Sequence, residues 1–482
     1  MVDPVGRGGS NTLVTHSGHD PHQEPDALAI WRAGVDAARP ERLLGNLLRV
    51  DQGPSAELTL QIGSTSFSLP TKGTWLVVGA GKAAAGMARG LVDVLEPRRP
   101  DSVRLDGLLS VPEPSAGQVG PLALRAGRPA QLNLPHADGV AVTAQILRSV
   151  AALKRSDRLI ALVSGGASAL LVAPAPGVSL HDLQDLTNAL SDAGADITEM
   201  NSVRRPLSRV KGGGLLRATG AGGVLGLLLS DVIGDDLATI GSGPTVPLQP
   251  DSAAAIEVLE RLGLWRDCPA GVRAALTTAP QLRPDRPPPV TNLVIGSNAD
   301  AVAGAAREAS ARGFSVLDLG TRTERDPSRV ATLLADLALS IRTRGEPVAA
   351  PVCIVAGGEA PVGLRADHGR GGRAQHLAVQ ILARLAPHGL EGITASIGGT
   401  DGEDGPTDAA GGVVQAQVVA AARALDLSAS DALDAQDTYP FLDATGGLLR
   451  TGLTGTNVAD LWVVTVDAPT ASGEAANGTA LR

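Results

Sequence analysis

Short apolar runs alternate along this chain with longer segments of helical period. Two typical runs are Trp75–Val78 and Val224–Leu229, which are rich in leucine and β-branched residues and show no polar alternation. A strand that is buried on both faces of a parallel sheet has this pattern. Comparable runs are Leu159–Val163, Leu293–Ile295, Val352–Val355, Gly392–Ile397 and Leu461–Val466.

The segments between these runs fit crossover helices. Ala83–Leu95, Val140–Leu153 and Ala299–Arg312 carry apolar residues at helical spacing. Alternation of strands with such helices predicts an α/β fold.

The length of 482 residues predicts roughly two to three domains. A Pro-rich segment at 280–289 is the best candidate for a linker, and it separates an expected N-terminal domain (28–279) from an expected C-terminal domain (290–470). The polar residues 1–27 predict a disordered N-terminal tail. The small, polar residues 471–482 predict a flexible C-terminal tail.

The charge balance argues against nucleic acid and membrane partners. The net charge is −9 and basic residues form no tract, while one Tyr and three Phe leave little for base stacking. No apolar run is long enough to span a membrane, and the N-terminus lacks the apolar core of a signal peptide. Cys268 and Cys353 lie far apart without the spacing of zinc ligands, so we expect a reducing compartment, the cytoplasm.

Nearly every apolar run ends in a small, polar, Gly-rich loop. In a parallel α/β sheet the carboxyl ends of the strands line the ligand crevice, so these loops predict one common site. The loops are Gly79–Lys82, Ser164–Ser168, Ser230–Asp236, Gly296–Asp300 and Gly357–Glu359.

Two of these loops suit an anion. Ser164-Gly-Gly-Ala-Ser168 could bring backbone N–H groups and the N-terminus of a helix to a phosphate, although a plain strand-to-helix turn with serine caps reads the same way. Gly79-Ala-Gly-Lys-Ala-Ala84 nearly matches the dinucleotide fingerprint, but no persuasive acidic residue follows to hold a ribose. Lys82 opens the next helix, where its ammonium group either reaches an anion or is solvated.

Two further segments gather cations. Four cationic residues lie among the eight residues of 204–211, and the neighbouring Asn201 and triple glycine fit a surface helix badly. Gly369-Arg-Gly-Gly-Arg-Ala-Gln375 resembles a nest of backbone donors. Arg373 would lie in the first turn of the helix that follows, a position the helix dipole disfavours unless an anion is near.

Acids gather in the segment Ser396–Gly411. It carries Asp401, Glu403, Asp404 and Asp408 within eight residues, together with five glycines. Crowded carboxylates repel one another unless a cation lies among them, and oxygen ligands suit Mg²⁺ or Ca²⁺. A solvated, turn-rich loop is the alternative.

Several enzyme classes lack their motifs in this sequence. It has no P-loop and no protein-kinase motif set. It also has no nucleophile elbow, because Ser168 is followed by Ala169 and then by Leu170, where the motif requires glycine.

Taken together, the segments resemble the glycerate 2-kinases of the MOFRL type, once often labelled hydroxypyruvate reductases. The matching stretches occur in family order from about Ile30 to Val466. They are Gly79–Ala84, Ser164–Leu171, Asn201–Arg204 with Lys211–Gly213, Ser230–Asp236 with Gly241–Thr245, Gly357–Glu359, Gly369–Gln375, Gly399–Gly411 and Thr454–Asn457.

The resemblance implies two Rossmann-like α/β domains, with parallel or mixed sheets, that face a deep interdomain cleft. It implies transfer of the γ-phosphate of ATP to the 2-hydroxyl of D-glycerate, with Mg²⁺ as cofactor and 2-phosphoglycerate and ADP as products. The partners would be these small molecules, and a homodimer is compatible with the resemblance.

Roles for individual residues follow as hypotheses from the resemblance and from the needs of phosphoryl transfer. Lys82 and Arg373 would stabilise charge on the phosphoryl group, and Asp231 or Asp235 would accept the hydroxyl proton. Arg204 and Lys211 would hold the substrate carboxylate. Asp401, Asp404 and Asp408 would hold Mg²⁺, and Ser164, Gly165, Gly166 and Ser168 would cradle a phosphate. The further binding candidates are Asn201, Ser230, Gly358, Glu359, Gly371, Gly372, Thr400 and Asn457.

Four positions depart from the family pattern. The family usually has Gly, His, Asn and Glu where Ala167, Pro206, Ala374 and His376 stand. These departures leave open a different substrate or lost activity. Ala374 and His376 also suggest a weakly active or non-catalytic binding protein on the same fold. A second alternative, an NAD(P)H-dependent hydroxypyruvate reductase, is suggested by Gly79-x-Gly81 and by the older family label.

Overall fold

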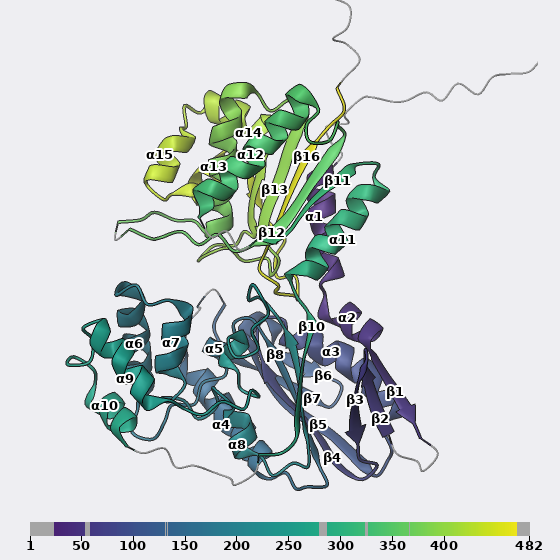
Figure 1. Cartoon of the computed structure of the whole chain (residues 1–482), viewed down its shortest axis with the longest axis vertical. Coiled ribbons are helices and arrows are strands. Elements are labelled where there is room, and N and C mark those ends of the chain that lie inside the picture. Colours follow the sequence, from purple (N-terminus) through teal and green to yellow (C-terminus); the bar gives the residue numbers. More distant parts are fainter. Residues whose placement is uncertain are drawn as a thin grey trace, which may run out of the picture.

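The computed structural model describes residues 24–53, 58–130, 132, 134–278, 287–322, 326–365 and 367–469. Within this range the chain forms two lobes, each a β-sheet covered by helices, which confirms the α/β class (Figure 1). The tail predictions for residues 1–23 and 470–482, and most of the expected linker, lie outside the described residues. A deep cleft between the lobes stays a prediction.

The first lobe is built on a seven-stranded sheet in which every strand but one runs parallel to its neighbours. In spatial order its strands are β10 (Val290–Gly296), β9 (Val224–Leu229), β8 (Arg158–Ser164), β4 (Gly73–Ala80), β5 (Val103–Pro112), β7 (Leu122–Arg128) and the antiparallel β6 (Gly117–Val119). Four of these strands contain predicted apolar runs. Three short antiparallel strands, which the apolar pattern did not predict, lie beside this sheet: β1 (Leu48–Gln52), β2 (Leu58–Ile62) and β3 (Thr65–Leu69).

Helices cover both faces of the seven-stranded sheet. One apolar cluster holds α2 and α3 against one face, a second holds α4 and α8 against the other, and a third forms a helical group from α6, α7, α9 and α10. The helices of this lobe are α2 (Pro40–Leu47), α3 (Ala84–Leu95), α4 (Ala137–Ala151), α5 (Ala167–Leu170), α6 (Leu180–Asp192), α7 (Ile197–Arg204), α8 (Gly214–Ala218), α9 (Ser252–Arg261) and α10 (Ala270–Thr277), with 3-10 turns η1 (Glu96–Arg98), η2 (Glu113–Ser115) and η3 (Ile240–Ser242).

The second lobe is built on a six-stranded mixed sheet. Its strands, in spatial order, are β11 (Ser315–Arg322), β12 (Val352–Gly358), β16 (Asp460–Val466), β13 (Ile393–Gly399), β14 (Gly411–Val414) and β15 (Leu448–Leu449), of which only β11 and β12 pair in parallel. Every residue of the central strand β16 is buried although its neighbours are antiparallel, because helices pack on both faces. The helices are α1 (Asp26–Ala37), α11 (Asn298–Ala311), α12 (Pro327–Arg344), α13 (Arg373–Leu385), α14 (Ala416–Ala424), α15 (Ala429–Asp434) and α16 (Thr438–Ala444), with the 3-10 turn η4 (Ala386–His388).

The predicted domain boundaries differ from the lobes at two places. Strand β10 was expected to open the C-terminal domain, but it pairs with β9 and extends the first sheet. Asp26 and Ala27, expected in a disordered tail, begin α1, which packs on α11 and β16 of the second lobe (Figure 1). The reason is apolar burial: Ala27 and Ile30 are fully buried on α1.

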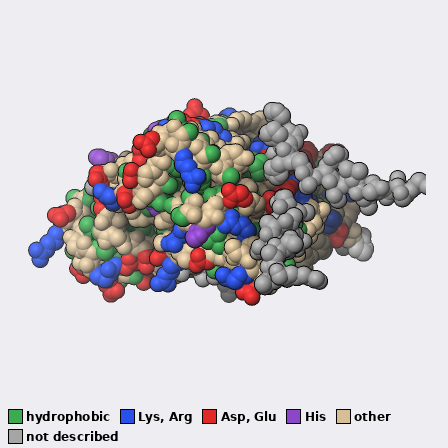
Figure 2. Space-filling view, turned by 90° about the horizontal axis from the view of Figure 1, so that it is seen from above, with side chains coloured by type: hydrophobic (Ala, Val, Ile, Leu, Met, Phe, Trp, Pro, Cys, Tyr) green, Lys and Arg blue, Asp and Glu red, His purple; other side chains and the backbone are tan. Residues whose placement is uncertain are grey.

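The surface seen in Figure 2 mixes the two charge signs. Lysine, arginine and acidic side chains are interspersed over this face, so the described side chains form no broad basic patch on it. In the described part of the chain, no helix combines the length and apolar character that a membrane crossing needs.

Trp31 anchors α1 to the second lobe. Its side chain is 1% exposed, and its indole Nε1–H donates to the carbonyl oxygen of Leu461 on β16 over 3.1 Å. The N-terminal helix is therefore part of the core rather than an appendage.

We expect Trp31→Ala to lower the free energy of unfolding by about 3–5 kcal/mol, because the truncation leaves a cavity and removes the hydrogen bond to the carbonyl oxygen of Leu461. Chemical denaturation followed by far-ultraviolet circular dichroism measures this. Leu425→Ala is the control, because Leu425 is 53% exposed and its truncation should change little. A loss no larger than that of the control would show that α1 is not anchored by Trp31.

Candidate active site

The carboxyl ends of the parallel strands meet at the edge of the first sheet that faces the second lobe. Strands β4, β8 and β9 are neighbours in this sheet, and they lead into the loops that begin at Gly81, Gly165 and Ser230. The order of apolar runs and Gly-rich loops predicted this convergence at the strand ends.

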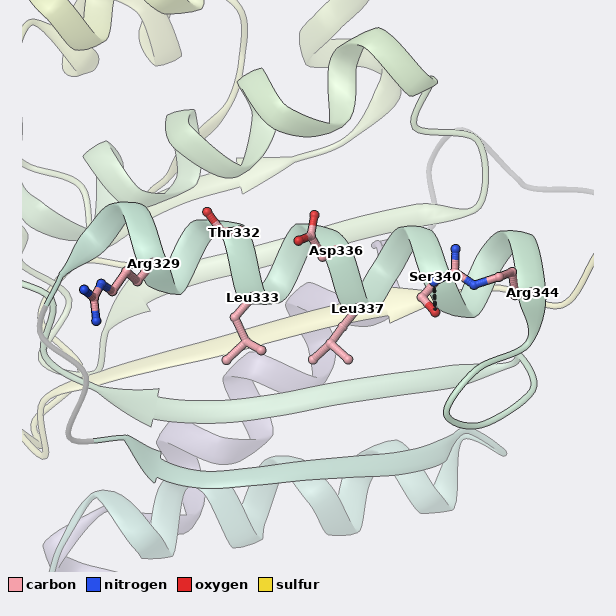
Figure 3. Close-up of a pocket in the computed structure, with 7 residues that line it drawn as sticks. All are labelled: Arg329, Thr332, Leu333, Asp336, Leu337, Ser340 and Arg344. Carbon is pink, nitrogen blue, oxygen red and sulfur yellow. Dashed lines mark hydrogen bonds between the residues drawn. The ribbon is translucent and has the colours of Figure 1, made fainter.

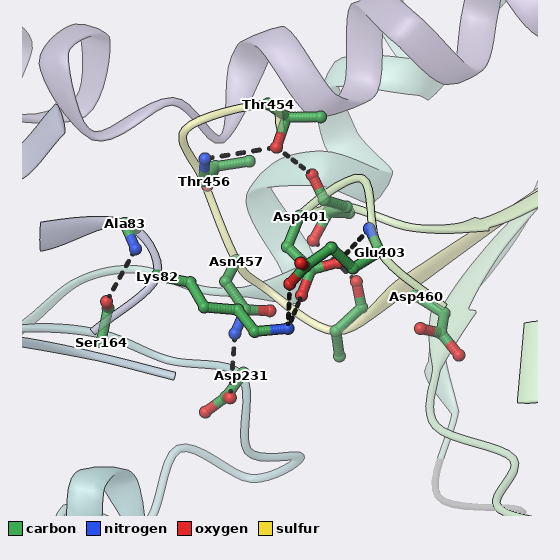
Figure 4. Close-up of polar contacts among 12 residues, drawn as sticks. Lys82, Ala83, Ser164, Asp231, Asp401, Glu403, Thr454, Thr456, Asn457 and Asp460 are labelled. Carbon is green, nitrogen blue, oxygen red and sulfur yellow. Dashed lines mark hydrogen bonds and ion pairs between the residues drawn. The ribbon is translucent and has the colours of Figure 1, made fainter. Parts of the chain in front are cut away.

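Lys82 joins the two lobes at this edge. Its Nζ lies 2.8 Å from Oδ2 of Asp401 and 2.8 Å from Oε2 of Glu403, both on the acid-rich loop of the second lobe (Figure 4). The main chain fixes its position: the N–H of Lys82 donates to Gly165 O over 2.8 Å. Burial works against the charged amine, but the two carboxylates outweigh it and raise the pKa of Lys82.

Asp231 lies next to this ion-pair cluster. Its Oδ2 accepts a hydrogen bond from Nδ2 of Asn457 over 3.2 Å, which is a second polar contact between the lobes (Figure 4). A Cβ on Gly165 would lie 1.9 Å from that carboxylate oxygen, so the approach requires glycine there. Burial, with the negative charge of Glu359, raises the pKa of Asp231 to about 6.

Arg373 forms the second ion-pair cluster. Its Nε and Nη2 donate to the two carboxylate oxygens of Asp460 over 2.9 and 3.0 Å, and its Nη1 donates to Glu359. Burial opposes the charge on Arg373, but Asp460 and Glu359 outweigh it and raise its pKa. The expectation that Arg373 opens a helix beside anions is therefore confirmed, with carboxylates as the anions seen.

Asp404 caps helix α13 from the acid-rich loop, and its assignment as a metal ligand stays a prediction. Its two oxygens accept the backbone N–H groups of Ala374 and Gln375 over 3.1 and 2.8 Å, at the N-terminus of α13. Gly372 makes room, because a Cβ there would lie 2.2 Å from the carboxyl carbon of Asp404. The departure at Ala374 leaves this cap intact, since the cap uses only the main chain.

Asp408 lies apart from the other two predicted metal ligands. It is exposed, and its carboxylate accepts hydrogen bonds from Tyr439 OH over 2.6 Å and Arg450 Nε over 3.3 Å. Within the described residues, no group of three His, Cys, Asp or Glu side chains is placed to hold a metal ion. Three acids of the loop Ser396–Gly411 thus have different partners: Asp401 contacts Lys82, Asp404 caps α13 and Asp408 contacts Tyr439.

A separate cationic group lies around α5 and α7. The Nζ of Lys211 donates to Ser168 O over 3.1 Å and to Ser242 Oγ over 3.3 Å, and Ser242 Oγ in turn donates to Asn201 Oδ1 over 2.8 Å. Arg204 lines the same pocket, and its side chain forms no hydrogen bond or ion pair with any described residue. Ser168, Arg204 and Lys211 line this pocket, and Ser242 and Asn201 are joined to Lys211 through hydrogen bonds. We call these five residues the cationic pocket.

No acid among the described residues balances the charge of the cationic pocket. Burial, together with Arg204 and Arg205, holds the pKa of Lys211 well below its ordinary value. Burial alone lowers the pKa of Arg204. The free space among the lining residues is about 20 Å³, enough for roughly one water-sized oxygen. A small anionic group would relieve the charge repulsion there.

Several predicted binding residues form hydrogen bonds that hold the loops together. Ser164 Oγ accepts the N–H of Ala83, Ser230 Oγ bonds within its own turn, and Thr400 Oγ1 donates to Ala459 O. Helix α5 after the Ser164 loop has only four residues, too short for the anion-binding helix N-terminus that the sequence suggested.

The remaining predicted residues lie around these centres. Gly358 pairs with Asp460 across β12 and β16, which sets Glu359 beside Arg373. Gly371 lies against Thr438, because a Cβ there would come within 2.4 Å of its hydroxyl oxygen. Asp235, four residues after Asp231, forms no hydrogen bond or ion pair through its side chain with any described residue.

Three residues at the site were not singled out by the sequence patterns. Glu403 was seen only as one acid of its loop, although it shares Lys82 with Asp401. Asp460 precedes an apolar run and is 2% exposed. Arg128 ends β7 on the same sheet edge and is 1% exposed. The rule that ligands bind at strand ends could have found Arg128.

A larger hollow lies elsewhere and contains none of the predicted site residues. It has a volume of about 550 Å³ and runs along the outer helix α12, where Leu333 and Leu337 point toward the sheet (Figure 3). Its size therefore says nothing about the chemistry at the strand ends.

We expect Asp404→Ala to lower the free energy of unfolding by about 1–2 kcal/mol, the usual effect of losing a helix cap. Burial raises the pKa of this carboxyl group to about 7, so the folded state holds its proton more tightly than the unfolded chain. The contribution of Asp404 to the free energy of unfolding should therefore decline as the pH rises from about 4 to 7. The Asp404→Ala variant should not show this decline.

Thermal unfolding at several pH values, with and without Mg²⁺, tests this assignment. The Mg²⁺-induced shift in Tm should be the same in Asp404→Ala and the wild type, whereas loss of that shift would make Asp404 a metal ligand after all. The exposed Asp408→Ala is the matched control from the same loop.

The comparisons with known proteins agree with this geometry. Residues 26–277 match a family described as a domain of unknown function (DUF4147), and residues 352–460 match the MOFRL family. A glycerate kinase of Rattus norvegicus is 35% identical, with 90% of this chain and 91% of that protein covered. A glycerate 2-kinase of Pyrococcus horikoshii is 32% identical, with 91% and 96% covered.

A solved structure agrees with the fold as well. The crystal structure of a glycerate kinase from Thermotoga maritima superposes with a TM-score of 0.73 at 31% identity, and covers 92% of this chain and 98% of its own. The two family models match residues 26–277 and 352–460, and the solved structure covers most of both lobes. The chain therefore belongs to the MOFRL family of glycerate kinases.

Proposed function

We propose that this protein is an ATP-dependent glycerate 2-kinase that gives 2-phosphoglycerate and ADP. The observation that carries the proposal is the pair of centres at one sheet edge. One is an ion-pair cluster that joins the lobes through Lys82, and the other is a buried cationic pocket whose charge no described acid balances. Relatives named glycerate kinase and glycerate 2-kinase support this choice of substrate.

On the donor side, Lys82 and Arg373 would bind the transferring phosphoryl group. Phosphoryl transfer needs positioning and charge stabilisation more than covalent chemistry, and both cations are held in place by carboxylates. ATP, as the donor, would compete with those carboxylates for the same N–H groups.

On the acceptor side, Arg204 and Lys211 would hold the glycerate carboxylate. A carboxylate supplies the negative charge that the cationic pocket lacks, and the free space of about 20 Å³ matches one of its oxygens. Asn201 and Ser168 would complete the hydrogen bonds around it.

Asp231 would accept the proton of the 2-hydroxyl group. A general base works best when its pKa lies near the working pH, and burial raises the pKa of Asp231 to about 6. Asn457 donates to Oδ2 of this carboxylate over 3.2 Å and so fixes its orientation.

The residues fit a magnesium ion that arrives with the nucleotide better than one held by protein alone. Mg²⁺ usually binds one or two carboxylates together with substrate phosphates, and Asp401 and Glu403 are two carboxylates that meet at one point. When bound, the ion would neutralise charge on the phosphates.

A cytoplasmic location and a homodimer stay predictions. Both cysteines are free and buried, as suits a reducing compartment. Gel filtration with light scattering would measure the assembly.

We expect the wild type to release ADP with D-glycerate and Mg·ATP, measured by a coupled assay over a panel of short hydroxy acids. NADH oxidation with hydroxypyruvate should be absent. Reductase activity without ADP release would favour the hydroxypyruvate reductase, and binding without either activity would favour the non-catalytic binding protein.

Lys82→Met should lower kcat about 10²–10³-fold, the usual effect of removing one group that stabilises transition-state charge. Lys72→Met is the matched control, because Lys72 is an exposed lysine just before β4. An unchanged kcat in a folded Lys82→Met variant would remove Lys82 from the mechanism.

The kcat/KM for glycerate should rise with pH through about 6, because Asp231 must be ionised to accept a proton. Asp231→Asn should lower turnover by about 10²–10⁴-fold and abolish this rise. Asp235→Asn is the control, and it tests the choice that the sequence left open. If Asp235→Asn loses the rise instead, Asp235 is the base.

A further inference from the structure

Arg128 is a buried cation with unused hydrogen-bonding capacity. Its side chain is 1% exposed, and its Nε–H has no hydrogen-bond partner among the described residues. Its one hydrogen bond to a described residue runs from Nη1 to the adjacent Pro129 O over 3.3 Å, which makes it a long and local contact. Nothing among the described residues therefore explains why a guanidinium group is buried there.

Burying such a group costs free energy. An arginine removed from water without a matching acid is among the more destabilising features of a folded chain, and apolar replacements at such sites are often neutral or stabilising. A buried guanidinium group that forms no ion pair is the arrangement expected where an anionic ligand binds.

The position of Arg128 links it to the proposed kinase site. It ends β7, so it lies on the sheet edge where β4 delivers Lys82. The acids that act on it electrostatically are Glu403 and Asp401, the partners of Lys82, although Arg128 forms no ion pair with either. The same two carboxylates thus act electrostatically on both Arg128 and Lys82.

We propose that Arg128 is a third cation of this site and that it binds a phosphate oxygen of the nucleotide. The inference rests on the proposed kinase function. A guanidinium group offers a planar fork of N–H donors that matches two oxygens of a phosphate. In the proposed function the cationic pocket binds the carboxylate of the acceptor. The anionic group that remains for Arg128 is therefore a phosphate of the nucleotide.

The rival explanation is a structural arginine that supports the end of β7. The two roles make opposite predictions for an apolar replacement of similar length. A structural arginine, when lost, lowers Tm and leaves the kinetics of the folded enzyme unchanged. A ligand-binding arginine, when lost, leaves Tm equal or higher and weakens the response to nucleotide.

Arg128→Met, Arg128→Lys and wild type are compared by thermal unfolding and by steady-state kinetics with ATP and D-glycerate varied in turn. Arg125→Met is the matched control, because Arg125 is an exposed arginine on the same strand. We expect Arg128→Met to lower kcat/KM for ATP about 100-fold and to keep its Tm, while the KM for glycerate stays within about twofold. Arg128→Lys should recover part of the loss, and the ATP-induced Tm shift should shrink in Arg128→Met.

Three outcomes would overturn the inference. The first is kcat/KM for ATP within about twofold of wild type in both variants, and the second is a rise in the glycerate KM alone, which would assign Arg128 to the carboxylate. The third is a marked fall in Tm of Arg128→Met while Arg128→Lys keeps full activity. A wild type without kinase activity would refute the proposed function instead, and the ATP-induced Tm shift would still test Arg128.

Discussion

The contact of one lysine with two carboxylates across the lobes is the interaction on which the site depends. Lys82 comes from the first lobe, and Asp401 and Glu403 come from the second. All three side chains are largely buried, so each would be costly to leave without its partners. Bringing the lobes together is what makes this burial tolerable, and it also places Asp231 and Arg373 beside the same point.

Charge is sorted rather than mixed in this region. The acids of the second lobe gather around Lys82 and Arg373, whereas no described acid balances the cations of the cationic pocket in the first lobe. The proposed function, which needs two anions and transfer of a phosphoryl group between them, would benefit from such sorting. In that proposal one anion would enter a place that lacks negative charge, and the other would displace carboxylates that are already paired.

Much of the fold was predictable because burial on both faces leaves a plain apolar signal. The run Val224–Leu229 is a strand with those same ends, and the run Trp75–Val78 grew by two residues at each end. The strands β1 to β3 were missed because they are short and mostly alternate in burial. The start of α1 was missed because the polar residues before it hide where its apolar face begins.

The site was predictable as a neighbourhood and much less so residue by residue. The strand ends indicated Lys82 and Asp231. For the acids of the loop Ser396–Gly411, closeness in sequence did not predict where their side chains lie. Asp401, Asp404 and Asp408 lie within eight residues, yet one meets Lys82, one caps α13 and one bonds Tyr439. Turns separate side chains that adjoin in the chain, and no composition rule reports which way each points.

The placement of α1 has a mechanical consequence. Because the N-terminal helix belongs to the second lobe, the chain passes between the lobes twice, once between α1 and α2 and once between β10 and α11. The two passages are neighbours, since Leu43 of α2 packs against Gly296 at the end of β10. We expect these two adjacent connecting segments to act together as a hinge. Such a hinge resists translation and twisting of one lobe against the other more than it resists rotation about the axis that passes through both segments.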